Sequence, residues 1–391
     1  MENRKKILIY NGQLFMGGIE RVLISYLQEL SKEKDLEITL LIKENDSEKN
    51  VFLQDVPKNI EVIFIKSEEE IKRREEISKK KSNIFYRAYY QIFLEMQRIK
   101  MKNWLKKYFK DNRFHSVIDF DMSLGKYIEV TEDKKIGWSH YSLAAKTGKK
   151  RERFRKRLGK YDKIVLICDE MQQEFNEIYP ELKDRGVRIY NPMRLEEIVE
   201  KSLDIDGLSS EERELLKDEY IVGVSRLVKG KGREDLIEIF GQLKNRGRKE
   251  KLYILGDGPE LENLKKQAKE LKIENEVFFL GQKKNPYVWM KNAKLFVHPS
   301  YGEGLGMVIT ESMVCGTPVA AYDCPTGPKE ILGDGKYGIL IKTGNKKKLE
   351  ERIYEYLERE EELKREYREK FHEIVDEFSG KNVVKKLKEI L

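Results

Sequence analysis

The sequence predicts an α/β protein of two domains, each with a parallel sheet that helices cover on both faces. The chain of 391 residues is too long for one ordinary hydrophobic core. Strand-length apolar runs alternate with helical periodicity from Lys5 onward, and the alternation starts again at Tyr220. Several strands run into loops spaced by glycines, which is typical of loops that approach a phosphate. We therefore expect two doubly wound domains, residues 1–195 and 196–375, followed by a last helix within 376–391.

The first domain opens with a strand at Lys5–Tyr10 and a helix at Ile19–Leu30. The loop between them ends in Gly17-Gly18, where the free N–H groups and dipole of a helix start attract anions. Two interpretations fit: the glycines belong to a phosphate site, or they only permit a tight turn. Later strands of this domain are expected at 37–42, 60–65, 117–121, 135–138, 164–167 and 187–190.

Residues 67–112 depart from this alternation and read as a helical insertion. Residues 71–113 hold 14 basic and 4 acidic side chains, and the aromatic residues of 84–109 are mixed with them. Helices of this composition lie on anionic membrane surfaces. The alternative is that the aromatic residues pack on the domain and the lysines are only solvated.

The net charge of +8 lies entirely in the first half, because residues 1–195 carry a net +10 and the remainder −2. Nine basic residues and one acid occupy 146–160. Nucleic acid is one possible partner for such a cluster, but no recognised nucleic-acid motif accompanies it. We favour an acceptor or membrane surface, contacted by Lys149, Lys150, Arg151, Arg153, Arg155 and Arg157.

His140 follows the strand expected at 135–138, at a strand end where ligand contacts are common. It is a candidate for contact with a reacting group, or else a core or capping histidine. Asp119 and Asp121 form an acid-x-acid pair of the kind that can bind a metal ion, but Asp204 and Asp206 repeat the pattern elsewhere. The match is therefore too short to predict a metal site, and we expect none.

The most informative stretch of the second domain runs from Phe296 to Leu332. A short strand is followed by a glycine-spaced loop at 302–306, a helix from Met307 to about Val314 and a strand at 319–322. Glu303 precedes the helix, and Glu311 lies about 7 Å along it from Gly306. The two acids either bracket an elongated ligand with a phosphate between them, or they are a dipole-complementing acid and an exposed helical glutamate.

A second loop, at 225–232, follows the strand expected at 220–224. It carries Arg226 and Lys231, and fixed cations of this kind stabilise negative charge on a departing phosphate without a metal ion. The alternative is a pair of solvated charges. Two further strands, at 252–255 and 277–280, also end in glycines, Gly256 and Gly281.

Taken together, these motifs resemble those of the retaining glycosyltransferases of family 4. Glu303, seven intervening residues and Glu311 stand in the pattern PS-x-x-EG-x-G-x-x-x-x-E-x-M-x-x-G-x-PV, and Arg226 and Lys231 in R-L-x-x-x-K-G. The Gly17-Gly18 loop, His140 and the Asn191-Pro192 turn also resemble family motifs. The resemblance implies the GT-B fold, with two Rossmann-like domains facing a cleft and the final helix crossing back to the first domain.

The resemblance also implies roles for these residues. Glu303 and His140 would contact the donor sugar, and Glu311 the ribose. The donor diphosphate would be held by Arg226, Lys231, Gly304, Leu305, Gly306, Gly17 and Gly18. The nucleobase would lie near Gly256, Gly281, Gln282 and Lys283. No metal ion and no cofactor would be needed, since the nucleotide-sugar is a substrate.

The implied reaction moves a hexose or N-acetylhexosamine from a nucleotide-sugar to an acceptor hydroxyl with retained configuration. Asp323–Pro328 resembles members that act in bacterial surface-glycan assembly, often with UDP-sugars and lipid-linked acceptors such as polyprenyl-diphosphate glycans. A GT-B isomerase or epimerase, a phosphorylase and a non-catalytic sugar-nucleotide binding module are the alternatives. Without a signal peptide or an apolar run of membrane-spanning length, we expect a cytoplasmic protein at the inner membrane face. The three cysteines have no metal-type spacing.

Overall fold

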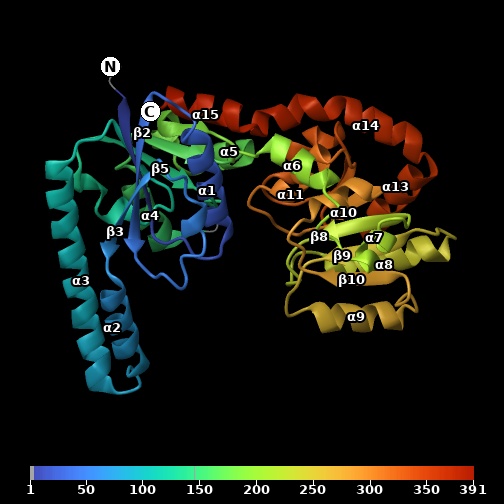
Figure 1. The fold of residues 1–391 in the computed structure, drawn as a ribbon, viewed down its shortest axis with the longest axis horizontal. Coiled ribbons are helices and arrows are strands. Elements are labelled where there is room, and N and C mark those ends of the chain that lie inside the picture. The colour runs from blue at the N-terminus through green and yellow to red at the C-terminus, as the bar shows by residue number, and fades with distance from the viewer. Residues whose placement is uncertain (1–3, 145) are drawn as a thin grey trace. The chain divides into compact units, whose positions relative to one another are not determined.

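The computed structural model describes residues 4–144 and 146–391, which divide into two compact units (Figure 1). Unit 1 takes in the described residues up to Met193 together with Gly380–Leu391, and unit 2 is Arg194–Ser379. The expected domains, 1–195 and 196–375, have similar limits. The last helix, α15 (Gly380–Glu389), is part of unit 1, where it packs against α1 (Gly18–Leu30).

Unit 1 contains a seven-stranded sheet with all neighbouring strands parallel, in the order β3-β2-β1-β4-β5-β6-β7. Its central strands are almost wholly buried, as expected for a parallel sheet covered on both faces. The direction of the strand order reverses between β1 and β4, and ligands of such sheets bind beyond the carboxyl ends of the strands at that point. The strands are β1 (Lys5–Asn11), β2 (Leu36–Glu44), β3 (Glu61–Lys66), β4 (Ser116–Asp119), β5 (Lys134–Ser139), β6 (Lys163–Leu166) and β7 (Gly186–Arg188).

Unit 2 repeats this plan with a six-stranded parallel sheet in the order β10-β9-β8-β11-β12-β13. Its strand order reverses between β8 and β11. The predicted fold class, two doubly wound Rossmann-like parallel sheets, is therefore confirmed. The strands are β8 (Tyr220–Val224), β9 (Lys251–Leu255), β10 (Val277–Gly281), β11 (Leu295–His298), β12 (Val319–Asp323) and β13 (Ile339–Lys342).

Two helices of unit 2 lie between the Asn191-Pro192 turn and β8. The first of these, α6 (Leu195–Leu203), packs against α10 and α11, so it belongs to the body of the unit. The remaining helices are α7 (Ser210–Leu215), α8 (Arg233–Asn245), α9 (Leu261–Glu270), α10 (Tyr287–Asn292), α11 (Met307–Val314), α12 (Pro328–Ile331), α13 (Lys346–Glu358) and α14 (Glu360–Val375).

Unit 1 also contains α4 (Gly148–Leu158), α5 (Asp169–Ile178) and a helical hairpin between β3 and β4. The hairpin consists of α2 (Glu68–Lys79) and α3 (Ile84–Asp111), which lie side by side and extend beyond the sheet of the unit (Figure 1). Ser67 begins α2 with a capping box that Glu70 completes. Within the described residues, no helix combines the length and apolar character needed to cross a bilayer.

The two interpretations of residues 67–112 bear on α3, which has a packed face and an exposed apolar face. One face packs on the unit and buries Phe93, Met101, Leu105 and Phe109. The opposite face leaves five apolar side chains, at the three- and four-residue spacing of a helical stripe, 43–80% exposed: Phe85, Tyr89, Ile92, Met96 and Ile99. Packing alone therefore does not account for the aromatic and apolar content of α3.

Candidate functional site

In unit 2 the two loops at the reversal point bring together the residues of the sequence motifs. The loop after β8 carries Lys231, and the loop after β11 carries Glu303. Their side chains form an ion pair, with Lys231 Nζ 2.6 Å from Glu303 Oε1 and both side chains less than one-fifth exposed. Lys231 Nζ also donates to the carbonyl of Gly302 at 3.4 Å. The structure thus joins two candidate residues that lie 72 positions apart.

Behind this ion pair lies a row of buried polar side chains. His298, at the end of β11, donates from Nε2 to Glu303 Oε1 at 2.8 Å. Its Nδ1 lies 3.5 Å from a guanidinium nitrogen of Arg233, whose own side chain is 1% exposed. This pattern of partners assigns His298 as a neutral imidazole with its proton on Nε2.

The charges in this row are set by burial and by one another. Burial alone would raise the pKa of Glu303, but the hydrogen bond from His298 and the positive charge of Lys231 together lower it to about 2. Burial lowers the pKa of His298 and that of Arg233, the latter to about 10. Glu303 is therefore ionised at neutral pH, and a buried hydrogen-bonding chain fixes its orientation.

Glycine is required where these loops touch. Gly232, at φ 65°, packs closely against the loop that follows β11. A Cβ at this position would lie 1.7 Å from the carbonyl oxygen of Pro299. Gly327, at φ 106°, lies as closely against Leu305, whose carbonyl oxygen would be 1.9 Å from a Cβ. The first contact sets the loops that carry Lys231 and Glu303 against each other without intervening side chains, and the second sets the loop after β12 against the segment that leads into α11.

The expected helix after the glycine loop is confirmed as α11, which Gly306 begins with a left-handed backbone at φ 76°. Gly304, Leu305 and Gly306 lead directly into its N-terminus, where helix N–H groups have no partner within the helix. Glu311 lies one to two turns along α11 and is half-buried. The N-terminus of α11, Glu303 and Lys231 therefore lie together at the reversal point of unit 2, as an anion-binding arrangement would require.

The other unit 2 candidates lie at the ends of β8, β9 and β10 or in the loops that follow these strands. Arg226 is exposed at the start of the loop after β8. Gly256, at φ 134°, allows the loop after β9 to contact the Ser225 carbonyl, since a Cβ would lie 1.8 Å from that oxygen. Gly281 ends β10 at φ 69°, and Gln282 beside it is exposed. Lys283 pairs with Glu212 at 2.7 Å, an engagement that the sequence did not indicate.

In unit 1 the reversal point opens into a pocket of about 560 Å³ that Gly17 and Gly18 line. The backbone at Gly17 is extended, and a Cβ there would meet the carboxylate of Glu20. That carboxylate also lines the pocket, and burial raises its pKa. The start of α1 therefore carries an acid of its own, which the sequence analysis did not single out.

Asp119 and Asp121 are each engaged within unit 1. Asp119 is buried and accepts hydrogen bonds from the Tyr161 hydroxyl at 2.5 Å and the Leu124 N–H at 3.2 Å. Burial and the neighbouring Asp121 raise the pKa of Asp119 to about 8. Asp121 accepts from the Gly12 N–H at 2.9 Å and from Ser123. Among the described residues, no group of three or more His, Cys, Asp or Glu side chains could hold a metal ion.

His140 directly follows β5 and is 7% exposed. Its Nε2 lies 2.8 Å from the carbonyl oxygen of Phe120, so Nε2 carries the proton and Nδ1 is left as an acceptor. Burial lowers the pKa of His140 to about 4, and the imidazole is neutral at pH 7. A charged, proton-donating role at neutral pH does not fit this environment, whereas accepting a hydrogen bond does.

The six basic candidates of α4 are not equivalent. Arg155 pairs with Glu152 and Glu181, and the Nε of Arg151 donates to the carbonyl of Lys146 at 2.7 Å. Arg157 lines a pocket beside α3. Three others are exposed and have no ion-pair partner within the described part of the chain: Lys149, Lys150 and Arg153.

Arg233 and His298 belong to the site although no sequence motif indicated them. His298 ends an apolar strand, and a polar residue in that position is the signal that could have found it, whereas Arg233 stands in a run of charged residues that gives no such signal. Neither has a spacing that distinguishes it from a loop residue before the fold is known.

Comparison with known proteins agrees with this architecture. Residues 205–374 match the family "Glycosyl transferases group 1". The N-acetylgalactosamine-N,N'-diacetylbacillosaminyl-diphospho-undecaprenol 4-alpha-N-acetylgalactosaminyltransferase of Campylobacter jejuni is 34% identical over 182 residues, 46% of this chain and 47% of that protein. The poly(glycerol-phosphate) alpha-glucosyltransferase of Bacillus subtilis is 25% identical over 364 residues, 92% of this chain and 49% of that protein. The chain thus spans about half the length of these curated relatives.

Among solved structures, HepE of Anabaena in complex with UDP and glucose aligns over 99% of both chains. The TM-score is 0.72 at 18% sequence identity, a level that speaks for the fold alone. The structural neighbours of this chain are GT-B glycosyltransferases, which confirms the fold that the motifs implied. Residues 205–374, nearly all of unit 2, are therefore a group 1 glycosyltransferase domain within a chain of GT-B fold.

Proposed function

We propose that the protein is a retaining glycosyltransferase that moves a hexose or N-acetylhexosamine from a nucleotide-sugar to an acceptor hydroxyl. The observation that carries the proposal is the joining of Lys231, Glu303 and the start of α11 at the reversal point of a group 1 domain. UDP is the favoured nucleotide, since the aligned HepE structure holds UDP and glucose.

In the proposed reaction the bond between the sugar and the diphosphate breaks, and negative charge develops on the departing nucleoside diphosphate. Lys231, Arg226 and the N–H groups of α11 would stabilise that charge from fixed positions. Glu303 would accept hydrogen bonds from sugar hydroxyls, because it is ionised and held by His298. Glu311 would hold the ribose. The neutral His140 would accept a hydrogen bond from the substrate through Nδ1.

The roles of Gly256, Gly281, Gln282 and Lys283 near the nucleobase remain predictions. So do a phosphate contact at Gly17 and Gly18, and a reaction that needs neither a metal ion nor a cofactor. Nucleic acid is not an expected partner.

The proposed acceptor is a lipid-linked, diphosphate-bearing glycan of bacterial surface-polysaccharide assembly. The name of the Campylobacter relative contains a diphospho-undecaprenol, and that of the Bacillus relative a poly(glycerol-phosphate). Both names describe phosphate-bearing acceptors.

A panel of UDP-sugars, assayed without added metal, tests the central proposal. Release of UDP that depends on an acceptor, with the product's anomeric configuration retained by NMR, is the expected result. Conversion of the sugar while it stays on UDP would indicate an isomerase instead. Tight binding of UDP-sugars with no turnover of any would indicate a binding module.

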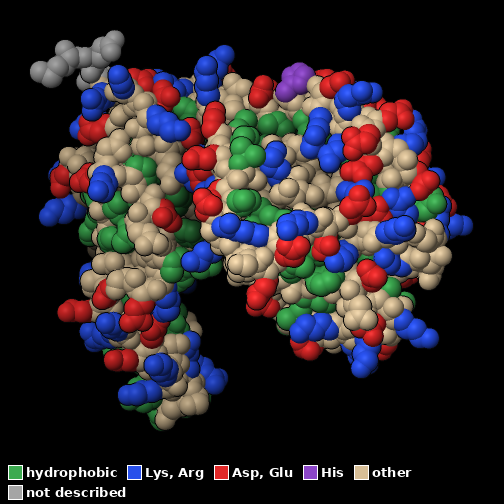
Figure 2. All heavy atoms as spheres, turned by 45° about the vertical axis from the view of Figure 1, so that its right-hand side comes forward, with side chains coloured by type: hydrophobic (Ala, Val, Ile, Leu, Met, Phe, Trp, Pro, Cys, Tyr) green, Lys and Arg blue, Asp and Glu red, His purple; other side chains and the backbone are tan. Residues whose placement is uncertain are grey.

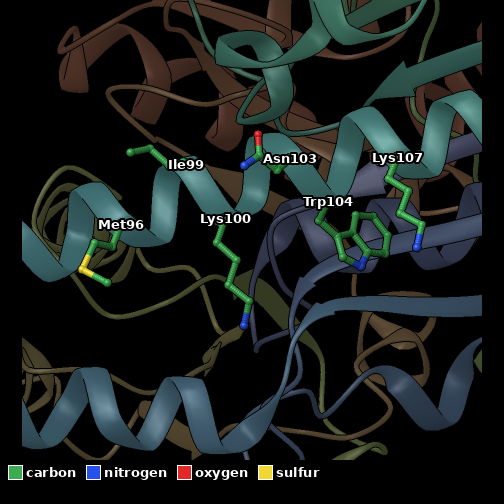
Figure 3. A pocket seen from close by; sticks show the side chains of 6 residues that line it. All are labelled: Met96, Ile99, Lys100, Asn103, Trp104 and Lys107. Carbon is green, nitrogen blue, oxygen red and sulfur yellow. The ribbon is translucent and has the colours of Figure 1, made fainter.

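We further propose that unit 1 attaches the enzyme to the cytoplasmic face of an anionic membrane. The exposed apolar stripe of α3 supports this, as do the seven basic and two acidic residues of that helix. A shallow pocket of about 580 Å³ continues the surface along α3, where Lys100, Trp104 and Lys107 extend from one side of the helix (Figure 3). Lys and Arg side chains are frequent on the hairpin, at the lower left of Figure 2. Apolar burial and lipid-headgroup attraction would act together on such a helix.

Flotation with vesicles of varied anionic lipid content tests the attachment. Changing Lys149, Lys150 and Arg153 to Gln should weaken binding at low salt, whereas the same change at Lys265, Lys266 and Lys269 of unit 2 should not. A Phe85→Ser/Ile92→Ser variant should lose the part of binding that resists salt. Indifference of the wild-type protein to anionic vesicles would contradict the proposal.

A further inference from the structure

A cationic pocket lies in unit 1 beneath the α2–α3 hairpin, and of its lining only Arg157 belongs to the candidate site residues named from the sequence. It has a volume of about 360 Å³. Of the described residues that line it, none is acidic and six are basic: Lys43, Lys66, Arg74, Arg98, Lys126 and Arg157. They come from β2, β3, both hairpin helices, the loop after β4 and α4, so the fold rather than one run of sequence assembles the charge.

Nearby acids neutralise only part of this charge. The Glu44 carboxylate accepts hydrogen bonds from both terminal nitrogens of Arg74, at 2.6 and 3.0 Å, and lies 3.2 Å from Lys43 Nζ. Arg98 pairs with Glu95 at 2.7 Å. Three cations remain that have no ion-pair partner within the described residues: Lys66, Lys126 and Arg157.

One of these three, Lys66, is partly withdrawn from solvent. It ends β3 and is half-buried, and the structure gives its Nζ no hydrogen bond among the described residues. Burial and the neighbouring cation Lys43 lower the pKa of Lys66. A desolvated ammonium group without a partner costs free energy that an anion in the pocket would offset.

The position of the pocket indicates which anion it serves. It shares Lys43 and Ser123 with the pocket that Gly17 and Gly18 line, so the two form one continuous surface at the carboxyl edge of the unit 1 sheet. Side chains with hydroxyl groups, Tyr10, Ser123 and Tyr127, complete the lining. Phosphate oxygens accept hydrogen bonds from ammonium, guanidinium and hydroxyl groups together.

We propose that this cationic pocket binds the phosphate group of the acceptor substrate, with Lys66, Lys126 and Arg157 as its principal contacts. The inference rests on the proposed glycosyl transfer, in which the acceptor's hydroxyl would occupy the neighbouring pocket of Gly17 and Gly18. It identifies the acceptor-binding determinant as a phosphate or diphosphate held by unit 1, whichever sugar is transferred.

Calorimetric titration of the full chain with inorganic diphosphate tests the pocket without requiring activity. The titration uses a Lys231→Ala background, so that the candidate anion site of unit 2 contributes little. Lys66→Gln and Lys126→Gln should each weaken diphosphate binding at least about tenfold, the scale of one charge-assisted hydrogen bond. Lys34→Gln is the matched control, because Lys34 is exposed on the loop before β2, at the opposite edge of the sheet. Equal affinities in Lys126→Gln, an exposed position with little risk to folding, and Lys34→Gln would overturn the proposal.

A competition experiment then identifies the source of the phosphate. Displacement of diphosphate by farnesyl diphosphate would assign the pocket to a lipid diphosphate, and displacement by a glycerol-phosphate oligomer to a phosphodiester polymer. Displacement by neither would overturn the proposal. The UDP-sugar panel tests the proposed function separately. Diphosphate binding that depends on Lys66, without turnover of any UDP-sugar, would contradict the proposed glycosyl transfer but support the anion pocket. Turnover of a UDP-sugar, with equal diphosphate affinities of Lys126→Gln and Lys34→Gln, would support the transfer but contradict the pocket.

Discussion

The two units have the same parallel strand order up to their last strands, yet the loops at their reversal points differ in chemistry. In unit 2 the loops after β8 and β11 join a lysine to an ionised glutamate and reinforce the pair with buried His298 and Arg233. In unit 1 the start of α1 and the loop after β4 carry acids, Glu20 and Asp121, and the cations come from β2, β3, both hairpin helices, the loop after β4 and α4. One architecture thus supports a rigid cationic centre within its loops and a wider cationic surface beside them.

This difference explains why the sequence was informative for one unit and less so for the other. The unit 2 centre is built from short loops, so Arg226, Lys231, Glu303 and Glu311 fall at fixed spacings that a sequence displays. The unit 1 pocket draws Lys43, Lys66 and Arg157 from distant elements, and no local spacing predicts that they meet. If the comparison is right, a substitution of one loop residue in unit 2 should strongly reduce turnover or stability. A single substitution in unit 1 should reduce them less, because several elements share the charge there.

The largest effect is expected from Lys231→Ala. Turnover should fall at least about a hundredfold, the scale of losing one preorganised charge stabiliser, with the fold intact. Lys229→Ala is the matched control, because Lys229 is exposed on the same loop and two residues away. Steady-state kinetics of the two purified variants is the measurement. Near-equal turnover would mean that Lys231 serves only to pair with Glu303.

The next effect concerns the close contact between the unit 2 loops. Gly232→Ala should lower the free energy of unfolding by about 3 kcal/mol or more, since a left-handed backbone and a clash with a carbonyl both cost. At Gly230, φ is 85° and a Cβ would meet nothing within 4 Å. Gly230→Ala should therefore cost only about 1 kcal/mol. Chemical denaturation of both variants compares the values, and a smaller loss for Gly232→Ala would show that the loops move apart freely.

Much of the fold and part of the candidate site were predictable from the sequence. Buried strands such as β1 and β11 are continuous apolar runs, and α11 is bounded by glycines that its backbone requires. Three features were not predictable, because each depends on tertiary contacts. The ion pair of Lys231 with Glu303, the division of α3 into a packed and an exposed face, and the burial of His140 all arise only when distant segments pack.

A third prediction addresses the buried acid of unit 1. Because the folded pKa of Asp119, about 8, lies above the ordinary value of 3.8, the folded state binds the proton more tightly. Its contribution to stability is complete below pH 4 and is lost as the pH rises to 8, by at most about 1.4 kcal/mol per pH unit. Asp119→Asn should remove this decline, whereas Asp111→Asn, at an exposed helix end, should keep it. Thermal unfolding between pH 5 and pH 9 measures the slopes, and parallel curves for wild type and Asp119→Asn would contradict the assignment.

The smallest effect is expected from removing metal ions. A divalent ion would be needed if Asp119 and Asp121 formed a metal site, but Asp119 is held by Tyr161 and Leu124, and Asp121 by Gly12 and Ser123. Charge on the leaving diphosphate would instead be met by Lys231 and Arg226. We therefore expect turnover to be unchanged by excess EDTA. Asp121→Asn should lower the free energy of unfolding by only about 1 kcal/mol, because Asn keeps one oxygen that accepts a hydrogen bond. Turnover of Asp121→Asn and of Lys231→Ala in the same metal-free assay shows which unit carries the residue that the reaction depends on more, and we expect it to be unit 2. If chelation abolished turnover and Mn²⁺ restored it, the charge-stabilising centre would not be the one in unit 2.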